Sequence, residues 1–560
     1  MKKYSIMGLT LLLTLFTVLA ACTPKKETVT LTVYSQLANS SGEMKGWFAE
    51  VLEKKFNVKI NIVNDGENIY TTRVESGNLG DIVVWGEDGI RYKNAVEKNL
   101  LFDWEQDGLL DEFGPYIKEN FGKALEKNRN LNGNNKLLGF GHDVALNADD
   151  HASFFYTWDI RYDLYERLNK PEIKDLDDLV ELFKEMKKLE PLDEAGTPTY
   201  ALSLWPDWDA EMVMYVKAMA TAYYGLDELG IGLYNVETGD YHGALEENGP
   251  YIQMLKFFNR LFQEGLIDPD SMTQTYDKMI EKVQRGGTFF SIFNYAGNIA
   301  YNTSEHVNAG KIMLSLAPSE ATPLVYGLNP MGGEYIWSIG SKTQYPELAM
   351  EIINWLSTPE GRMTVEYGPK DLNWYYDEEG YTKFTELGKK MRQNLSEPFP
   401  ADSGYTGTFK DGSYKLGGTT WSLDAINPES KQEERFHWDY WKSNQGENLN
   451  DVHKRWREEF SSDNNQQYLE KHTNYKVAIA TSFSKGSRDA ELNAKWGRVI
   501  KEITDGSWKA IYAKDDKEFN IYINEMTRKA NGHGYQLCLE WSQQEALRRH
   551  TLEQQVKNSK

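Results

Sequence analysis

Cysteine and basic charge are both scarce in this chain. Only Cys22 and Cys538 occur among its 560 residues, which excludes a fold that depends on a framework of disulfides. Its 62 Lys and Arg residues are outnumbered by 84 Asp and Glu residues, giving a net charge of −22 at pH 7. Because Lys and Arg are the chief ligands of nucleic-acid phosphates, this balance argues against nucleic acid as a partner. We interpret the acidic surplus as favouring solubility.

The sequence motifs of common enzymes are also missing. The Gly-Lys pairs that begin at Gly122, Gly310 and Gly388 are followed by Ala, Ile and Lys, so none forms a phosphate-binding loop. Neither H-E-x-x-H nor G-x-S-x-G occurs. We therefore expect a binding protein that is not an enzyme and needs no cofactor or metal. A secreted carbohydrate-active enzyme is the alternative, because the two carboxylates of a glycosidase leave no spacing signature.

The start of the chain has the pattern of an export signal. Lys2 and Lys3 precede an apolar run from Ile6 to Leu19, which is too short to be read as a membrane-spanning helix. The run ends in Leu-Ala-Ala-Cys at residues 19–22, which resembles the lipobox of bacterial lipoproteins.

The lipobox predicts a signal peptide at residues 1–21, a Cys22 that becomes the lipid-modified N-terminus, and a tether at residues 22–28. Lipidation of Cys22 would leave no pair of thiols for a disulfide. Two acyl chains would anchor the protein stably at the extracellular face of the cytoplasmic membrane. The alternative is an ordinary secretory signal with a chance cysteine. No second apolar stretch of membrane-spanning length follows.

Apolar residues in the first hundred positions recur alternately at strand spacing and at helical spacing. The predicted elements, in order, are a strand at 29–34, a helix at 44–52, a strand at 58–62 and a buried strand at 82–85. This alternation indicates a parallel α/β sheet. Further helices are predicted at 176–183, 255–262, 346–356 and 492–503, and a long exposed loop at 396–418.

The segment Gly80–Asp88 (GDIVVWGED), followed by Leu100–Asp103 (LLFD), resembles a motif of family 1 extracellular solute-binding proteins, which serve carbohydrate-importing ABC transporters. Further stretches resemble family segments in the same order, at 136–140, 162–168 with 175–179, 283–289 and 346–357. The chain departs from the family pattern at Leu138, Gly141 and Leu176, where the family usually has an aromatic residue, Pro and Trp. The resemblance covers roughly residues 28–375. The remainder looks like the variable helical extension of the larger Gram-positive members.

The resemblance implies an α/β, two-lobe, periplasmic-binding-protein-like fold with the ligand cleft between the lobes and a helical C-terminal extension. The implied crossing segments are 139–146, 332–340 and 366–374. Lobe 1 would comprise residues 29–140 plus 335–372, and lobe 2 residues 141–334 plus 373–560. It further implies a lipid-anchored monomer that captures a carbohydrate, most simply an oligosaccharide, by hinge closure. Its partners would be the permease subunits of an ABC importer.

Sugar recognition suggests which residues bind the ligand. A pyranose has apolar C–H faces and a rim of hydroxyls, so aromatic rings suit the faces and carboxylates or amides suit the rim. The segments 85–88 and 205–209 combine both types, and both match ligand-contacting segments of maltodextrin-binding members. The predicted ligand-binding residues are Trp85, Glu87, Asp88, Trp205, Trp208, Asp209, Asn294, Tyr295, Trp337, Trp374 and Trp421. The alternative for any tryptophan is burial in the core, which we predict for Trp47 and Trp355 because they lie on helical stripes.

Overall fold

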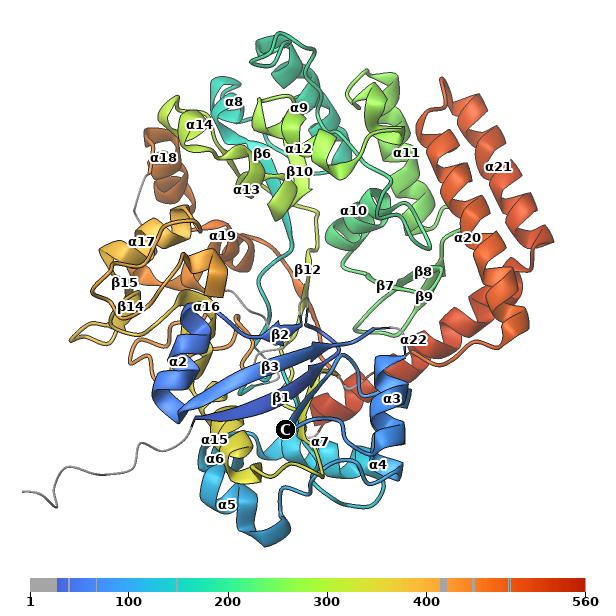
Figure 1. The fold of residues 1–560 in the computed structure, drawn as a ribbon. Coiled ribbons are helices and arrows are strands. Elements are labelled where there is room, and N and C mark those ends of the chain that lie inside the picture. The colour runs from blue at the N-terminus through green and yellow to red at the C-terminus, as the bar shows by residue number, and fades with distance from the viewer. Residues whose placement is uncertain are drawn as a thin grey trace, which may run out of the picture. The chain divides into compact units, whose positions relative to one another are not determined.

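The computed structural model (Figure 1) describes residues 28–558 except 39–40, 67, 148–149, 413–419, 446–448, 482 and 484. The predicted signal peptide, Cys22 and all of the tether except Thr28 lie outside the described residues. In the part of the chain that is described, no helix is both long enough and apolar enough to cross a membrane.

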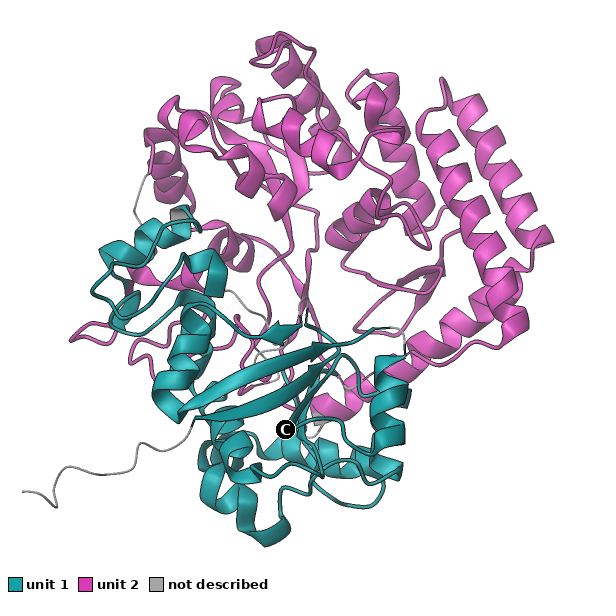
Figure 2. Ribbon diagram, in the orientation of Figure 1, with its two compact units in different colours: residues 1–142, 334–375, 384–420 teal, residues 143–333, 376–383, 421–560 magenta. Residues whose placement is uncertain are grey.

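Contacts divide the chain into two compact units (Figure 2). Unit 1 comprises residues 1–142, 334–375 and 384–420, and unit 2 comprises 143–333, 376–383 and 421–560. The sequence prediction assigned 384–420 to lobe 2. In the structure this segment groups with unit 1 because Trp47 stacks on Phe409 at 5.5 Å and its Nε1 donates to the Phe409 carbonyl oxygen at 2.9 Å. The other predicted lobe boundaries stay a prediction.

Unit 1 is built on a six-stranded sheet in the order β2-β3-β1-β4-β13-β5. Its strands are β1 (Val29–Ser35), β2 (Gly42–Glu43), β3 (Val58–Asn64), β4 (Ile82–Trp85), β5 (Phe140–Gly141) and β13 (Ile336–Ile339). Strands β3, β1 and β4 are parallel, as the alternating pattern predicts. Strand β13 is antiparallel to both β4 and β5 and pairs with each of them, so the sheet is mixed.

Helices cover the sheet of unit 1. They are α2 (Trp47–Phe56), α3 (Ile69–Ser76), α4 (Ile90–Glu97), α5 (Leu109–Phe113), α6 (Pro115–Asn120), α7 (Gly122–Asn132), α15 (Pro346–Leu356), α16 (Pro359–Tyr367) and α17 (Glu386–Gln393). Proline fits the first turn of α15, where its missing N–H would have no helical partner. Trp47 and Trp355 are both buried, which confirms their predicted place in the core. The described residues of the predicted loop, 396–412, contain one short 3-10 turn at Phe409–Gly412.

Unit 2 has a central antiparallel sheet in the order β10-β6-β11. Its strands are β6 (Tyr156–Arg161), β10 (Phe290–Phe293) and β11 (Met313–Ser315). A second antiparallel sheet holds β7 (Asp227–Leu229), β8 (Gly232–Tyr234) and β9 (Tyr241–Gly243). Strand β12 (Leu324–Tyr326) pairs in parallel with β16 (Lys476–Ala478). Strands β14 (Trp374–Tyr376) and β15 (Thr382–Phe384) pair with each other, and each contains residues of both units.

The helices of unit 2 pack around these sheets. They are α8 (Tyr162–Arg167), α9 (Leu176–Leu189), α10 (Met214–Tyr224), α11 (Pro250–Gln263), α12 (Tyr276–Gln284), α13 (Asn298–Tyr301), α14 (Ser304–Asn308), α18 (Asp451–Phe460), α19 (Asn465–His472), α20 (Ala490–Ile511), α21 (Asp516–Gly532) and α22 (Tyr535–Asn558). All five helices predicted from the sequence are present, as α2 and α15 of unit 1 and α9, α11 and α20 of unit 2. Residues of α20 to α22 share one apolar core with β6 and β10, so the helical C-terminal region is an integral part of unit 2 (Figure 1).

Candidate ligand-binding site

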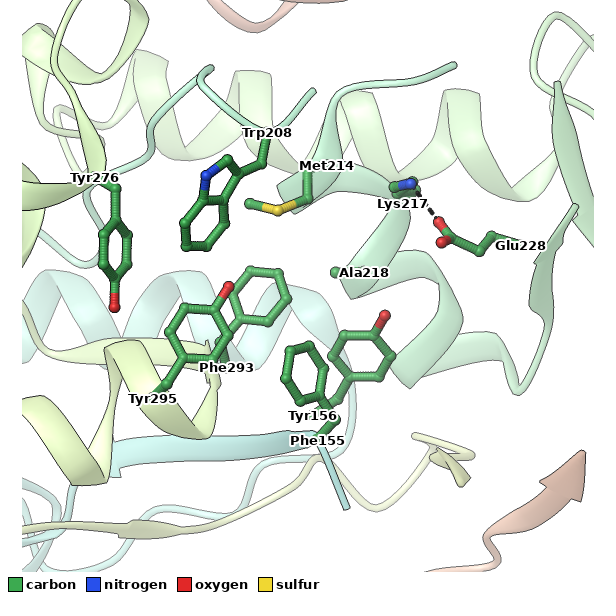
Figure 3. Close-up of a pocket in the computed structure, with 10 residues that line it drawn as sticks. All are labelled: Phe155, Tyr156, Trp208, Met214, Lys217, Ala218, Glu228, Tyr276, Phe293 and Tyr295. Atoms are coloured by element: carbon green, nitrogen blue, oxygen red, sulfur yellow. Dashed lines mark ion pairs between the residues drawn. The ribbon is translucent and has the colours of Figure 1, made fainter. Parts of the chain in front are cut away.

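Unit 2 contains a pocket of ≈ 440 Å³ whose walls are mainly aromatic (Figure 3). The lining residues come from the start of β6 and the residue before it, the loop before α10, α10 itself, β7, α12, the end of β10 and the 3-10 turn that follows it. They are Phe155, Tyr156, Trp208, Met214, Lys217, Ala218, Glu228, Tyr276, Phe293 and Tyr295. Such a pocket, apolar with a few polar groups, is the usual form of a small-molecule site.

Trp208 forms one wall of the pocket. Its side chain is 46% exposed, and its ring stacks on Tyr276 with the centroids 4.6 Å apart and the planes 29° apart. The backbone N–H of Tyr276 donates to Asp207 Oδ2 at 3.0 Å, which ties the start of α12 to the loop that carries Trp208. A large ring is therefore held open to solvent with one face supported.

Trp205 lies beneath this wall and is only 1% exposed. Its ring makes edge contacts with Trp208 at 5.5 Å and Tyr276 at 5.4 Å, and a tilted contact with Phe293 at 5.8 Å. Aromatic rings prefer such edge-to-face packing over a face-to-face sandwich. Trp205 thus supports the pocket from the core side, while Trp208 faces the solvent.

Asp209 anchors the loop between the two tryptophans and α10. Its carboxylate accepts hydrogen bonds from the Met214 N–H at 2.8 Å and from Trp508 Nε1 at 2.7 Å. Burial raises the pKa of Asp209 to about 6, and the hydrogen bond from Met214 opposes that rise. Asp209 therefore joins α10 to α20, and its bonded oxygens face protein groups.

Three further packed aromatic rings continue the surface formed by Trp208, and Tyr295 contacts both Trp208 and Tyr276 at 6.0 Å. Tyr295 stacks on Phe293 at 5.2 Å, and Phe155 packs against Tyr295 at 5.4 Å (Figure 3). Tyr156 is 9% exposed, and burial raises the pKa of its hydroxyl, which stays a neutral hydrogen-bond donor and acceptor. Aromatic faces and a tyrosine hydroxyl are thus presented to the same space.

The charged groups of the pocket form a single pair. Lys217 Nζ on α10 lies 2.5 Å from Glu228 Oε2 on β7, and the Lys217 side chain is 13% exposed (Figure 3). Because the two charges neutralise each other, the lining carries no net charge. This composition suits a neutral ligand with apolar faces and hydroxyl groups.

The structure brings together some of the residues predicted from sequence and separates others. Trp208 and Tyr295 line this pocket, Trp205 lies directly behind it, and Asn294 precedes Tyr295 in a short 3-10 turn. Asp209 is close to them but holds α10 and α20. The 205–209 segment is therefore the part of the prediction that coincides with a pocket.

The predicted site residues of unit 1 lie elsewhere. Trp85 is fully buried on β4, where its Nε1 donates to Ser338 Oγ at 3.2 Å and its ring packs edge-on against Tyr92 at 5.5 Å. No surface of this ring is open in the structure, because apolar neighbours cover it. Glu87 is exposed and Asp88 is partly exposed. A ligand contact by any of these residues stays a prediction.

The remaining predicted tryptophans are also buried. Trp337 on β13 packs against His142 at 5.1 Å, Trp374 donates from Nε1 to the Gly368 carbonyl oxygen at 2.9 Å, and Trp421 packs on Phe436 at 5.7 Å. Each is 3% exposed or less. The structure accounts for these rings as core residues, and their predicted role in ligand binding stays untested.

Most of the residues that line the pocket were not predicted from the sequence. These are Phe155, Tyr156, Met214, Lys217, Ala218, Glu228, Tyr276 and Phe293. Tyr276 follows the helix cap Thr275, and Phe293 closes a buried strand, so each fits an ordinary structural role in the sequence. The Trp-Pro-Asp-Trp-Asp segment was the one local signal for the site.

Comparison with known proteins assigns the family. Residues 37–363 match the model of the bacterial extracellular solute-binding protein family, which covers more than half of the chain. The chain belongs to this family, which confirms the resemblance seen in the Gly80–Asp88 motif and the segments that follow it. No match to the chain was found among curated protein sequences.

Solved structures of solute-binding proteins have the same fold. An extracellular solute-binding protein from Bifidobacterium longum subsp. infantis aligns with a TM-score of 0.56 and 14% identity, over 95% of this chain and 100% of that one. The alginate-binding protein AlgQ2 aligns at 0.54 and 15%, over 93% and 98%. The S. pneumoniae ABC-transporter substrate-binding protein FusA, solved with kestose, aligns at 0.51 and 14%, over 94% and 100%. The chain therefore has the periplasmic-binding-protein-like α/β fold.

Proposed function

We propose that this solute-binding protein is a lipid-anchored extracellular receptor that captures a carbohydrate, most simply an oligosaccharide, and delivers it to the permease subunits of an ABC importer. The observation that carries the proposal is the aromatic pocket of unit 2, with Trp208 stacked on Tyr276 and in contact with Tyr295. The descriptions of similar structures support it. AlgQ2 is described as alginate-binding, a solute-binding protein from Bifidobacterium longum infantis as HMO-binding, and FusA was solved in complex with kestose.

The chemistry of the pocket fits a neutral sugar. The exposed part of the Trp208 ring offers an apolar surface for the C–H face of a pyranose, and each stacked ring adds about 0.5–1.5 kcal/mol beyond its buried area. The hydroxyl of Tyr156 and the Lys217–Glu228 pair can exchange hydrogen bonds with the sugar hydroxyls. Both features that sugar binding needs are therefore present on one surface.

A calorimetric screen tests the proposed function. Kestose, an alginate oligomer, cellobiose and diacetylchitobiose are titrated into the wild-type protein, and the same sugars are incubated with it for product analysis. We expect saturable binding of at least one neutral sugar with no change in its chain length. Hydrolysis products would favour the alternative of a carbohydrate-active enzyme. Among the described residues that line the pocket, Glu228 is the only carboxylate, whereas a glycosidase needs two.

Ligand capture by closure of two lobes gives a measurable change in size. A sugar that binds only the closed form shifts the population toward that form, so the radius of gyration is expected to fall when the sugar saturates the protein. Small-angle X-ray scattering with and without the sugar identified by calorimetry measures this change. An unchanged radius of gyration at saturation would argue against hinge capture.

The lipid anchor is tested at Cys22. Cys22→Ala removes the sulfur that would carry the diacylglycerol, so the protein is expected to leave the membrane fraction for the medium or to accumulate as an unprocessed precursor. Fractionation after labelling with radioactive fatty acid checks this, and Cys538→Ser serves as the matched control because it removes the other thiol. Label retained by the Cys22 variant would rule out the anchor.

A further inference from the structure

Strand β7 separates the pocket from the C-terminal helix α22. Successive side chains of a strand point to opposite faces, so Asp227 and Glu228 project in opposite directions. Glu228 pairs with Lys217 at the pocket. Asp227, which is 1% exposed, pairs with Arg549 of α22, whose guanidinium Nη2 lies 2.7 Å from Asp227 Oδ2. Strand β7 therefore contacts the pocket through one face and α22 through the other.

Helix α22 holds the neighbouring strand β8 as well. Arg549 Nε lies 3.2 Å from Glu553 Oε1, and the same Glu553 oxygen accepts a hydrogen bond from the Tyr234 hydroxyl at 2.7 Å. The Tyr326 hydroxyl donates to the other oxygen of Asp227 at 2.9 Å. Arg549 thus bridges two buried carboxylates, and each of these also accepts from a tyrosine.

The turn between β7 and β8 is fitted closely to the same helix. Gly230 has a φ of +58°, and a Cβ placed there would lie 2.2 Å from Ser542 Oγ. The Ser542 hydroxyl accepts from the Ile231 N–H at 3.3 Å. Only a glycine allows this approach, so α22 fixes both the turn and the strand that leads into it.

Removal of the Arg549 side chain is expected to disturb this contact more than its presence stabilises the protein. A buried ion pair adds little net stability because desolvation offsets the attraction, but removing one partner leaves an uncompensated buried charge. Burial raises the pKa of both Asp227 and Glu553, and the Arg549 charge opposes that rise. The side chain of Arg549 therefore sets where Asp227 can lie, and with it the adjacent Glu228.

We propose that Arg549 is a positioning residue of the ligand pocket: by holding Asp227 it fixes β7 so that Glu228 keeps Lys217 in place on the pocket wall. This inference rests on the proposed function only in taking the pocket as the ligand site. It gives the helical C-terminal region a role in shaping the site although α22 contributes no lining residue.

Acetylation of Lys217 tests the proposal without a ligand. Wild type, Arg549→Lys and the double variant Asp227→Asn/Arg549→Met are treated with acetic anhydride, and labelling of Lys217 is measured by mass spectrometry relative to the exposed Lys256. The double variant removes both charges of the Asp227–Arg549 pair, while Glu553 keeps the hydrogen bond from the Tyr234 hydroxyl and its contact with His550 at 3.8 Å. Trp541→Leu is the matched control, because Trp541 lies on α22 but packs on Trp496 of α20 at 5.2 Å. Circular dichroism melting establishes that each variant is folded.

We expect the double variant to label Lys217 roughly fivefold faster than wild type, the ratio that corresponds to loss of a modest ion pair. Arg549→Lys keeps the charge, so Lys217 should be labelled at an intermediate rate in this variant. In Trp541→Leu, Lys217 should be labelled at the wild-type rate even if the variant unfolds at a lower temperature. Wild-type labelling in both Arg549 variants would overturn the proposal, as would an equal increase in Trp541→Leu. If Arg549→Met in the double variant prevents folding, Arg549→Lys decides. Failure of the sugar screen would leave this labelling result unaffected.

Discussion

Trp208→Ala is expected to weaken sugar binding by about tenfold or more while the melting temperature changes little. The ring is 46% exposed, and under the proposed function it contributes mainly the surface on which the sugar would stack. Loss of a stacked ring and its contact area corresponds to roughly one to a few kcal/mol of binding free energy. Calorimetric titration with the sugar identified in the screen, together with thermal unfolding, measures both quantities.

Trp205→Ala is the matched comparison, three residues away in the same segment. Its ring is buried among Trp208, Tyr276 and Phe293, so truncation should cost about 3–5 kcal/mol of stability through the cavity that it leaves. Binding should then fall as well, because the supporting layer of the pocket is lost. If Trp208→Ala destabilises the protein as much as Trp205→Ala and binds sugar normally, Trp208 is a core residue and the site assignment is wrong.

The second large effect is a dependence of stability on pH through Asp159. This residue is buried on β6, and burial raises the pKa of its carboxyl to about 7, against opposing hydrogen bonds from Asn298. Between pH 4 and 7 the folded protein therefore holds a proton that the unfolded chain has released. Stability contributed by this group is greatest at low pH and falls as the pH rises toward 7, by at most about 4 kcal/mol.

Asp159→Asn isolates this effect from the titration of other carboxyls. Asparagine stays neutral, so the free energy of unfolding of the variant minus that of wild type should increase from pH 5 to pH 8 by on the order of 3 kcal/mol. Urea denaturation of both proteins at the two pH values measures the difference. An equal difference at both would mean that Asp159 does not change its protonation state in this range.

The elements that could be predicted from sequence are those with strong apolar periodicity. The alternation of Val29, Leu31 and Val33 gave β1, and the run Ile82–Trp85 gave β4 with its observed bounds. In both cases burial of one face or of a whole strand constrains the residue types directly. Strand β13 was foreseen only as a crossing segment, because its place between β4 and β5 depends on pairing with residues far away in the chain.

The site was harder to predict because burial of an aromatic ring depends on its surroundings. Trp205 and Trp208 have the same side chain in the same five-residue segment, yet one is 1% and the other 46% exposed. Trp85 carries the family motif but lies inside unit 1. Similarly, no local pattern pairs Lys217 on a helix with Glu228 on a strand. The burial of each tryptophan and the pairing of Lys217 with Glu228 depend on tertiary packing, which local sequence patterns do not predict.

The position of β13 has a consequence for the order in which the protein folds. Strand β4 pairs with β13 through Ile82, Val83, Val84 and Trp85, but β13 is synthesised only after residues 143–333. The 250 residues between β4 and β13 take roughly 13–50 s to synthesise at about 5–20 residues per second. During that time the nascent β4 has an apolar edge without its partner strand, which is the kind of edge that promotes aggregation. The sheet of unit 1 therefore cannot be completed until β13 has been synthesised.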